Sequence, residues 1–196
     1  IFNYSLKARP PSKSVISKHI FLDGIWEPEM TKLMLDYTEQ GMYVFDIGAD
    51  IGYYTLLLRN KVKKEGKVFA FEPLDLSREY LKENISFNNL DNVEVFNFGF
   101  FDMKGQIGFK DDKIILNSKA KDLDSFIEIE TFDNFIAQNN IPKVDLIKID
   151  CEGAEFNILK GMSKNLVKHR PMIFLEIHPK FLPNFGYDEN NVIDFL

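Results

Sequence analysis

A glycine-rich turn between an apolar run and an amphipathic segment limits the folds open to this chain more than any other feature. Residues 46–52 read Asp-Ile-Gly-Ala-Asp-Ile-Gly; they complete the apolar run 42–47, and residues 53–62 then carry apolar side chains at helical spacing. Glycines let the backbone turn sharply and approach a ligand closely, and the N-terminus of the following helix offers free N–H groups. The turn therefore predicts an α/β fold in which a buried strand passes directly into a helix.

Short β-branched runs and longer amphipathic segments continue to alternate along the chain, which is typical of a parallel sheet with crossover helices. Residues 99–130 interrupt this rhythm with short runs typical of antiparallel or irregular strands. We expect residues 1–40 to form an N-terminal extension with one helix at 29–38, and residues 41–196 to form one α/β domain. The other expected strands are 67–71, 93–97, 144–149 and 172–177, with short ones at 106–109, 114–116 and 126–129; the other expected helices are 75–88, 131–139 with Thr131 as its N-cap, 154–167 and 189–196.

Composition and charge exclude several other classes of protein. The chain has 196 residues, of which 45% are hydrophobic and 28% charged, close to the average of a soluble globular protein. Its single cysteine, Cys151, cannot form an internal disulfide and fits a reducing compartment. The net charge of -6 argues against a nucleic-acid partner, and no apolar run reaches the ~20 residues that a membrane span requires. We therefore expect a cytoplasmic protein without a membrane partner that acts on a small-molecule or sugar-like compound.

Two acidic residues near the turn indicate a nucleoside ligand. Asp46 ends the strand, and the turn's glycines, Gly48 and Gly52, have the spacing G-x-x-x-G rather than the G-x-G-x-x-G of a dinucleotide site. A carboxylate here repels a pyrophosphate but attracts the cationic methionine part of S-adenosylmethionine. Glu72, at the end of the second expected strand, can accept hydrogen bonds from both ribose hydroxyls. The alternative, a merely structural tight connection, explains the glycines but not the second acid.

Further carboxylates follow the expected strand 144–149. Asp150 and Glu152 would lie at the same sheet edge as Asp46 and Glu72, because the carboxyl ends of parallel strands meet there. Four converging carboxylates repel one another unless a cation, a metal or a proton lies among them. An alternative is that Glu152 and Glu155 only stabilise a helix N-terminus.

A histidine follows the fifth expected strand. His178 lies in the run Phe-Leu-Glu-Ile-His-Pro at 174–179, at the same sheet edge. Its ordinary pKa near neutrality suits a base that takes the proton of a hydroxyl. The alternative is a hydrogen-bonded structural histidine. Cys151 is better explained as a small buried residue than as a nucleophile.

Four blocks of sequence together resemble the FkbM family of S-adenosylmethionine-dependent methyltransferases. They are DIGADIGYYT at 46–55, FAFEP at 69–73, LIKIDCEGAEFNILKGM at 146–162 and IFLEIHP at 173–179. The resemblance implies the Rossmann-like class I methyltransferase fold, a mostly parallel sheet with helices on both faces, whose final antiparallel strand pair we expect to be truncated in this chain. It also implies O-methylation of a hydroxyl on a sugar or small natural product. One departure is Asp50, where the family commonly has Asn.

The resemblance and the residues together predict an S-adenosylmethionine-dependent methyltransferase that releases S-adenosylhomocysteine. His178 is the first candidate for the base, and Glu176 or Glu152 is the second. Two alternatives stay open: a metal-assisted O-methyltransferase with a divalent ion among Asp150, Glu152 and Glu155, which we do not favour, and a non-catalytic nucleoside-binding module. Tyr4, Trp26, Phe100 and Phe101 are candidates to line an aromatic acceptor pocket, although burial in the core also explains them. The predicted cofactor-binding residues are Asp46, Gly48, Ala49, Asp50, Gly52, Tyr53, Phe71, Glu72, Pro73, Leu74, Phe98 and Asp150, with no residue assigned to a metal.

Overall fold

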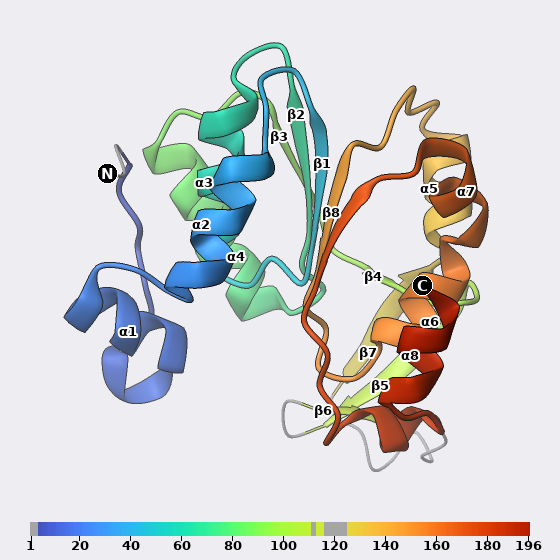
Figure 1. Cartoon of the computed structure of the whole chain (residues 1–196). Helices are drawn as coiled ribbons and strands as arrows, with labels where there is room; N and C mark the ends of the chain where they lie inside the picture. The colour runs from blue at the N-terminus through green and yellow to red at the C-terminus, as the bar shows by residue number, and fades with distance from the viewer. Residues whose placement is uncertain (1–3, 111–112, 116–124) are drawn as a thin grey trace.

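A sheet of five parallel strands forms the centre of the molecule (Figure 1). The computed structural model describes residues 4–110, 113–115 and 125–196. The strand order β3-β2-β1-β8-β9 changes direction between β1 and β8, so their connections run to opposite sides and a crevice opens at their carboxyl ends. The predicted parallel sheet is thus confirmed. Its strands are β1 (Tyr43–Ile47), β2 (Lys67–Phe71), β3 (Val93–Phe96), β8 (Leu146–Ile149) and β9 (Met172–Leu175).

Helices cover both faces of this sheet (Figure 1). Along β1, Val44 packs into one hydrophobic cluster with residues of α2 and α3, whereas Phe45 packs into the other with residues of α5 and α6. Strands buried on both faces explain the nearly continuous apolar runs of the sequence. One side carries α2 (Pro28–Tyr37), α3 (Tyr53–Val62) and α4 (Asp75–Phe87), with α1 (Val15–Asp23) beyond them; the other carries α5 (Phe132–Gln138), α6 (Glu155–Gly161), α7 (Ser163–His169) and α8 (Glu189–Phe195).

A second, smaller sheet confirms the interruption expected at 99–130. Its order is β4-β7-β5-β6, with β5 antiparallel to both neighbours and β4 parallel to β7. Ile107, Ile127 and Ile129 from this sheet are buried against the main core. Leu116, expected at the end of a short strand, lies outside the described residues. The strands are β4 (Gly99–Phe100), β5 (Gly105–Lys110), β6 (Lys113–Ile115) and β7 (Ser125–Glu130).

The expected single helix at 154–167 is wrong, because two helices, α6 and α7, meet at Met162. A Cβ on Gly161, the last residue of α6, would lie 2.0 Å from the carbonyl oxygen of Phe101. The loop after β4 therefore packs directly against the end of α6. Apolar periodicity continues across the break between the two helices, so the sequence pattern did not predict this break.

The N-terminal extension also differs from the expectation of one helix. It holds α1 and α2, and a 3₁₀ helix at Pro11–Lys13. Ser14 caps α1 by accepting a hydrogen bond from the backbone N–H of Ser17, and Gly24 ends it at a φ of 73°. Apolar residues lie all around α1: Ile16 and Ile20 pack against the core, whereas Phe21 and Leu22 are exposed, so apolar periodicity did not predict this helix. The N-cap predicted at Thr131 is confirmed, since its side chain accepts from the Asn134 N–H.

Within the described residues, none of the helices combines the length and the apolar character needed to cross a membrane.

Candidate active site

A cavity of about 1210 Å³ opens at the carboxyl ends of β1, β2 and β8. Trp26, Phe100 and Phe101, expected near an acceptor, line it, whereas Tyr4 does not. Asp46, Gly52 and Phe98 lie outside its lining, and so do the side chains of Glu176 and His178. The predicted residues that line it are Gly48, Ala49, Asp50, Tyr53, Phe71, Glu72, Pro73, Leu74, Asp150 and Glu152.

The glycine turn connects the three central strands. The N–H groups of Gly48 and Ala49 both donate to the carbonyl oxygen of Phe71, at 3.1 and 3.0 Å. Gly48 has a φ of +80°, and a Cβ there would lie 1.9 Å from the carbonyl oxygen of Asp150. No other residue fits this position. At Gly52, by contrast, the close neighbour is Leu81 of α4, 2.6 Å from a Cβ, so the second glycine serves helix packing.

Glu72 holds the turn to the loop after β2. Its Oε2 accepts a hydrogen bond from the Asp50 N–H and its Oε1 one from the Leu74 N–H, both at 2.9 Å. The residue is 6% exposed, and this burial raises the pKa of its carboxyl from 4.5 to about 7. Each oxygen keeps a further lone pair, so the carboxylate can still accept hydrogen bonds from a ligand in the cavity.

Asp46 and Lys148 form a buried ion pair beneath the turn. They are neighbours in the register of β1 and β8 and lie on the sheet face that packs on α3. Asp46 is fully buried; it accepts a hydrogen bond from Thr55 Oγ1 at 2.5 Å, and its Oδ1 lies 3.4 Å from Lys148 Nζ. The carboxylate predicted to contact the cofactor thus lies under the turn, outside the cavity lining.

Lys148 lines the cavity and was not predicted from the sequence. Its Nζ donates to the Gly48 carbonyl oxygen at 2.7 Å and lies 3.4 Å from Asp150 Oδ2. The two carboxylates raise its pKa, although burial acts in the opposite direction as the largest single effect. Lys148 supplies one cation that the converging carboxylates require. A lysine inside the apolar run LIKI was the signal that could have found it.

Asp50 also has a cationic partner, which comes from the N-terminal segment. Arg9 Nη2 lies 2.8 Å from Asp50 Oδ1, and both residues line the cavity. Asn84 of α4 anchors the same segment, because its side chain accepts from the Lys7 N–H and donates to the Lys7 carbonyl oxygen. The charge at position 50 is therefore paired.

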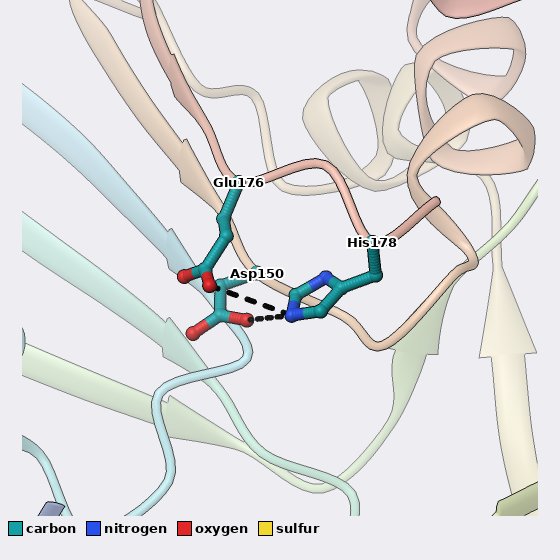
Figure 2. A group of neighbouring side chains, drawn as sticks. All are labelled: Asp150, Glu176 and His178. Carbon is teal, nitrogen blue, oxygen red and sulfur yellow. Dashed lines mark ion pairs between the residues drawn. The ribbon is translucent and has the colours of Figure 1, made fainter. Parts of the chain in front are cut away.

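His178 lies among four carboxylates behind the cavity. Its Nδ1 is 2.8 Å from Oε1 of the fully buried Glu155, which also accepts the Gly153 N–H. Its Nε2 lies 3.5 Å from Glu176 Oε1 and 3.8 Å from Asp150 Oδ1. The dashed lines of Figure 2 mark these two ion pairs. The hydrogen bond to Glu155, with help from the other carboxylates, raises the pKa of His178 to about 9.

These contacts correct the ligand set expected for a metal. Glu155 is bonded to His178 and buried, and Glu152 lies 3.9 Å from His178 Nε2. The ligand atoms that come within 4.8 Å of one another belong instead to Asp150, Glu176 and His178.

Cys151 lines the cavity, and burial raises the pKa of its thiol well above the usual value, so the thiol is not activated.

The strand order, the turn after β1 and the acid after β2 define a Rossmann-like class I methyltransferase fold. The sequence model of the family described as "Methyltransferase FkbM domain" matches residues 46–196, so the chain belongs to the FkbM methyltransferase domain family. The predicted family and fold are both confirmed.

Relatives and solved structures agree with this assignment. The hexuronic acid methyltransferase AglP of Haloferax volcanii is 29% identical over 173 residues, which cover 87% of this chain and 67% of the relative. The structure of methyltransferase FkbM from Methylobacillus flagellatus KT superposes with a TM-score of 0.56 at 19% identity, covering 79% of this chain and 37% of that one. SMU.1697c, a putative methyltransferase from Streptococcus mutans in complex with SAH, superposes with a TM-score of 0.54 at 11% identity. The match covers 87% of this chain and 81% of that one. The chain thus spans about two thirds of the AglP relative and about a third of the FkbM structure.

Proposed function

We propose that this methyltransferase transfers the methyl group of S-adenosylmethionine to a hydroxyl of a sugar or small natural product. The observation that carries the proposal is the cavity at the carboxyl ends of β1, β2 and β8, which brings the glycine turn and Glu72 together. The SAH bound to one structural neighbour and the hexuronic acid named for the AglP relative support the cofactor and the acceptor class.

The cavity lining suggests how this chain would hold the cofactor. Glu72 would accept hydrogen bonds from the ribose hydroxyls through its remaining lone pairs. The backbone at Gly48 and Ala49 would pack against the cofactor, and Phe71 with Leu74 would flank the adenine. The methionine ammonium would bind near Asp150. Asp46 would act indirectly, by fixing Lys148 and through it the Gly48 carbonyl oxygen.

Methyl transfer demands little chemistry of the protein beyond alignment. The acceptor oxygen forms a bond to the methyl carbon as the bond from that carbon to sulfur breaks, and the sulfur keeps the electron pair. Holding oxygen, carbon and sulfur in line therefore supplies most of the rate. A base has only to take the hydroxyl proton.

His178 is our first candidate for this base. Glu155 fixes its Nδ1, so Nε2 is the nitrogen left for a hydroxyl. Because its pKa is raised to about 9, neutral His178 is a minor form at neutral pH, and transfer by this route would accelerate as the pH rises toward that value. Glu176 and Glu152 are the second candidates.

Calorimetric titration with S-adenosylhomocysteine tests the cofactor, with NAD as the control ligand. We expect micromolar binding of the first and none of the second. Glu72→Ala should weaken the binding by about 1–3 kcal/mol, because charge-assisted hydrogen bonds are lost. The matched control is Glu79→Ala, an exposed acid of α4 outside the cavity lining. Equal affinity of wild type and Glu72→Ala would remove Glu72 from the site.

A second assay separates an enzyme from a non-catalytic nucleoside-binding module. Methyl transfer from labelled S-adenosylmethionine is measured with uronic acids and neutral sugars as acceptors. Labelled product with any of these acceptors supports the proposed enzyme. Tight cofactor binding without product across such a panel would favour the binding module.

A further inference from the structure

We propose that Asp150, Glu176 and His178 form a binding site for one divalent first-row metal ion, such as Mn²⁺, beside the cofactor cavity (Figure 2). Asp150 follows β8, and Glu176 and His178 follow β9, so two adjacent strand ends supply all three ligand atoms. The site deepens the proposed function and rests on it for its role in catalysis, but its existence is measurable without turnover.

The distances fit a single ion. Zn²⁺, a first-row ion, binds carboxylate oxygen and imidazole nitrogen at roughly 2.0–2.2 Å, so two ligands of one such ion lie at most about 4.4 Å apart. Nε2 of His178 lies 3.5 Å from Glu176 Oε1 and 3.8 Å from Asp150 Oδ1. All three ligand atoms lie within 4.8 Å of one another, so only a small contraction would bring them around one ion, and the 39% exposed side chain of Glu176 is free to make it.

The orientation of His178 points to a cation at Nε2. Glu155 Oε1 accepts the hydrogen bond of Nδ1, which places the proton of a neutral ring on Nδ1 and the lone pair of the ring on Nε2. That lone pair faces two carboxylate oxygens, an arrangement of acceptors that only a proton or a metal ion can satisfy. A buried carboxylate behind a histidine is also the usual support of a metal-binding imidazole.

The two carboxylates are open for ligation. Neither the Asp150 nor the Glu176 side chain accepts a hydrogen bond from any described residue; Asp150 Oδ2 has Lys148 Nζ at 3.4 Å. Behind them, Glu155 Oε2 is buried and has no hydrogen-bond partner in the described part of the chain. Negative charge at this point thus exceeds what Lys148 and a protonated His178 neutralise, which is the condition a divalent ion would relieve.

The donor set selects the class of ion. Two carboxylates and one imidazole suit Mn²⁺ and its first-row neighbours, whereas Ca²⁺ takes six to eight oxygen ligands. Three protein ligands leave coordination positions for an acceptor oxygen, whose hydroxyl proton a bound cation makes easier to remove. With the ion bound, His178 would be a ligand, and Glu152, whose Oε2 lies 3.9 Å from His178 Nε2, would be the carboxylate left to take the hydroxyl proton.

Titration of the chain with Mn²⁺, followed by the electron paramagnetic resonance signal of the free ion, tests the site. We expect one saturable site in the wild type. Glu176→Gln and His178→Asn should each weaken it by at least about tenfold, since losing even a supporting residue of a metal ligand costs about 10–100-fold. Glu152→Gln is the matched control; it removes the same charge 3.9 Å from the same nitrogen without removing a ligand, and its affinity should stay within about threefold.

Two results would overturn the proposal. One is the absence of saturable Mn²⁺ binding by the wild type. The other is an equal loss in Glu152→Gln and Glu176→Gln, which would mean a diffuse acidic surface. Circular dichroism checks the folding of each variant, and S-adenosylhomocysteine titration of the same samples keeps the two proposals apart. Cofactor binding without Mn²⁺ binding would remove the metal site alone and leave the proposed function standing.

Discussion

Replacing Glu72 with glutamine should change how the stability of the protein depends on pH. In the folded chain, burial raises the pKa of Glu72 from its ordinary 4.5 to about 7. A carboxyl with a raised pKa binds its proton more tightly in the folded state than in the unfolded one. Its contribution to stability is therefore fully present below about pH 4.5 and is lost as the pH rises through about 7.

The size of the effect follows from these two pKa values. Between pH 5 and pH 8, the ionisation of Glu72 should lower the free energy of unfolding of the wild type by about 2.5 kcal/mol. Glutamine has no such ionisation. The amide replaces only one of the two acceptors that the Asp50 and Leu74 N–H groups use, but this loss is the same at every pH. As the pH rises, the free energy of unfolding of Glu72→Gln should therefore increase relative to that of the wild type.

Urea unfolding at several pH values between 5 and 8, followed by circular dichroism, measures this difference. Glu79→Gln provides the control, because Glu79 lies exposed on the neighbouring α4. Unfolding free energies of wild type and Glu72→Gln that run parallel over this range would refute the argument that burial dominates at Glu72.

Three further perturbations test the packing and charge around the site. Lys148→Met should cost about 3–5 kcal/mol of unfolding free energy, because it leaves the buried Asp46 without its cation, and adding Asp46→Asn should recover part of the loss in urea titrations. Gly161→Ala should destabilise by about 2 kcal/mol or more, since its Cβ would meet the Phe101 carbonyl oxygen, whereas Gly99→Ala, with only ordinary contacts, should be close to neutral; equal thermal shifts would contradict this. The Cys151 thiol, whose pKa is raised by burial, should react slowly with a disulfide reagent at pH 8 and quickly once urea unfolds the chain.

Sequence patterns predicted those helices and strands whose ends are determined by neighbouring residues in the chain. The bounds of α3 and β2 match the expected ranges, because apolar periodicity and a glycine turn delimit them. The break after Gly161 and the helix α1 were missed. The break depends on the loop at Phe101, some sixty residues away in the chain, and α1 carries apolar residues on its exposed side as well as on the side that packs on the core.

The candidate site was also predicted only in part. The sequence placed its acids at strand ends, and the structure brings Glu72, Asp50 and Asp150 to one cavity. Sequence patterns could not tell which acids face the cavity and which lie beneath it, because the position of an acidic side chain depends on how the strands pair. Asp46 lies beneath the turn since its neighbour in the register is Lys148, and Arg9 reaches Asp50 from a segment forty-one positions earlier.

Burial and neighbouring charges together shift the pKa values of the titrating groups around the cavity. The pKa values of Glu72, Glu152 and Glu176 are all raised, mainly by burial and further by Asp50 or Asp150, and that of His178 is raised by the acids around it. Around Lys148 and His178 lie the four carboxyl groups of Asp150, Glu152, Glu155 and Glu176, so acidic groups outnumber basic ones at this edge of the sheet. An acidic edge of this kind disfavours a pyrophosphate and favours a cationic ligand. The sulfonium and ammonium groups of the proposed methyl donor carry positive charge, and the proposed metal ion would add more positive charge at the same edge. Lys148, 3.4 Å from both Asp46 Oδ1 and Asp150 Oδ2, offsets part of this negative charge within the protein itself.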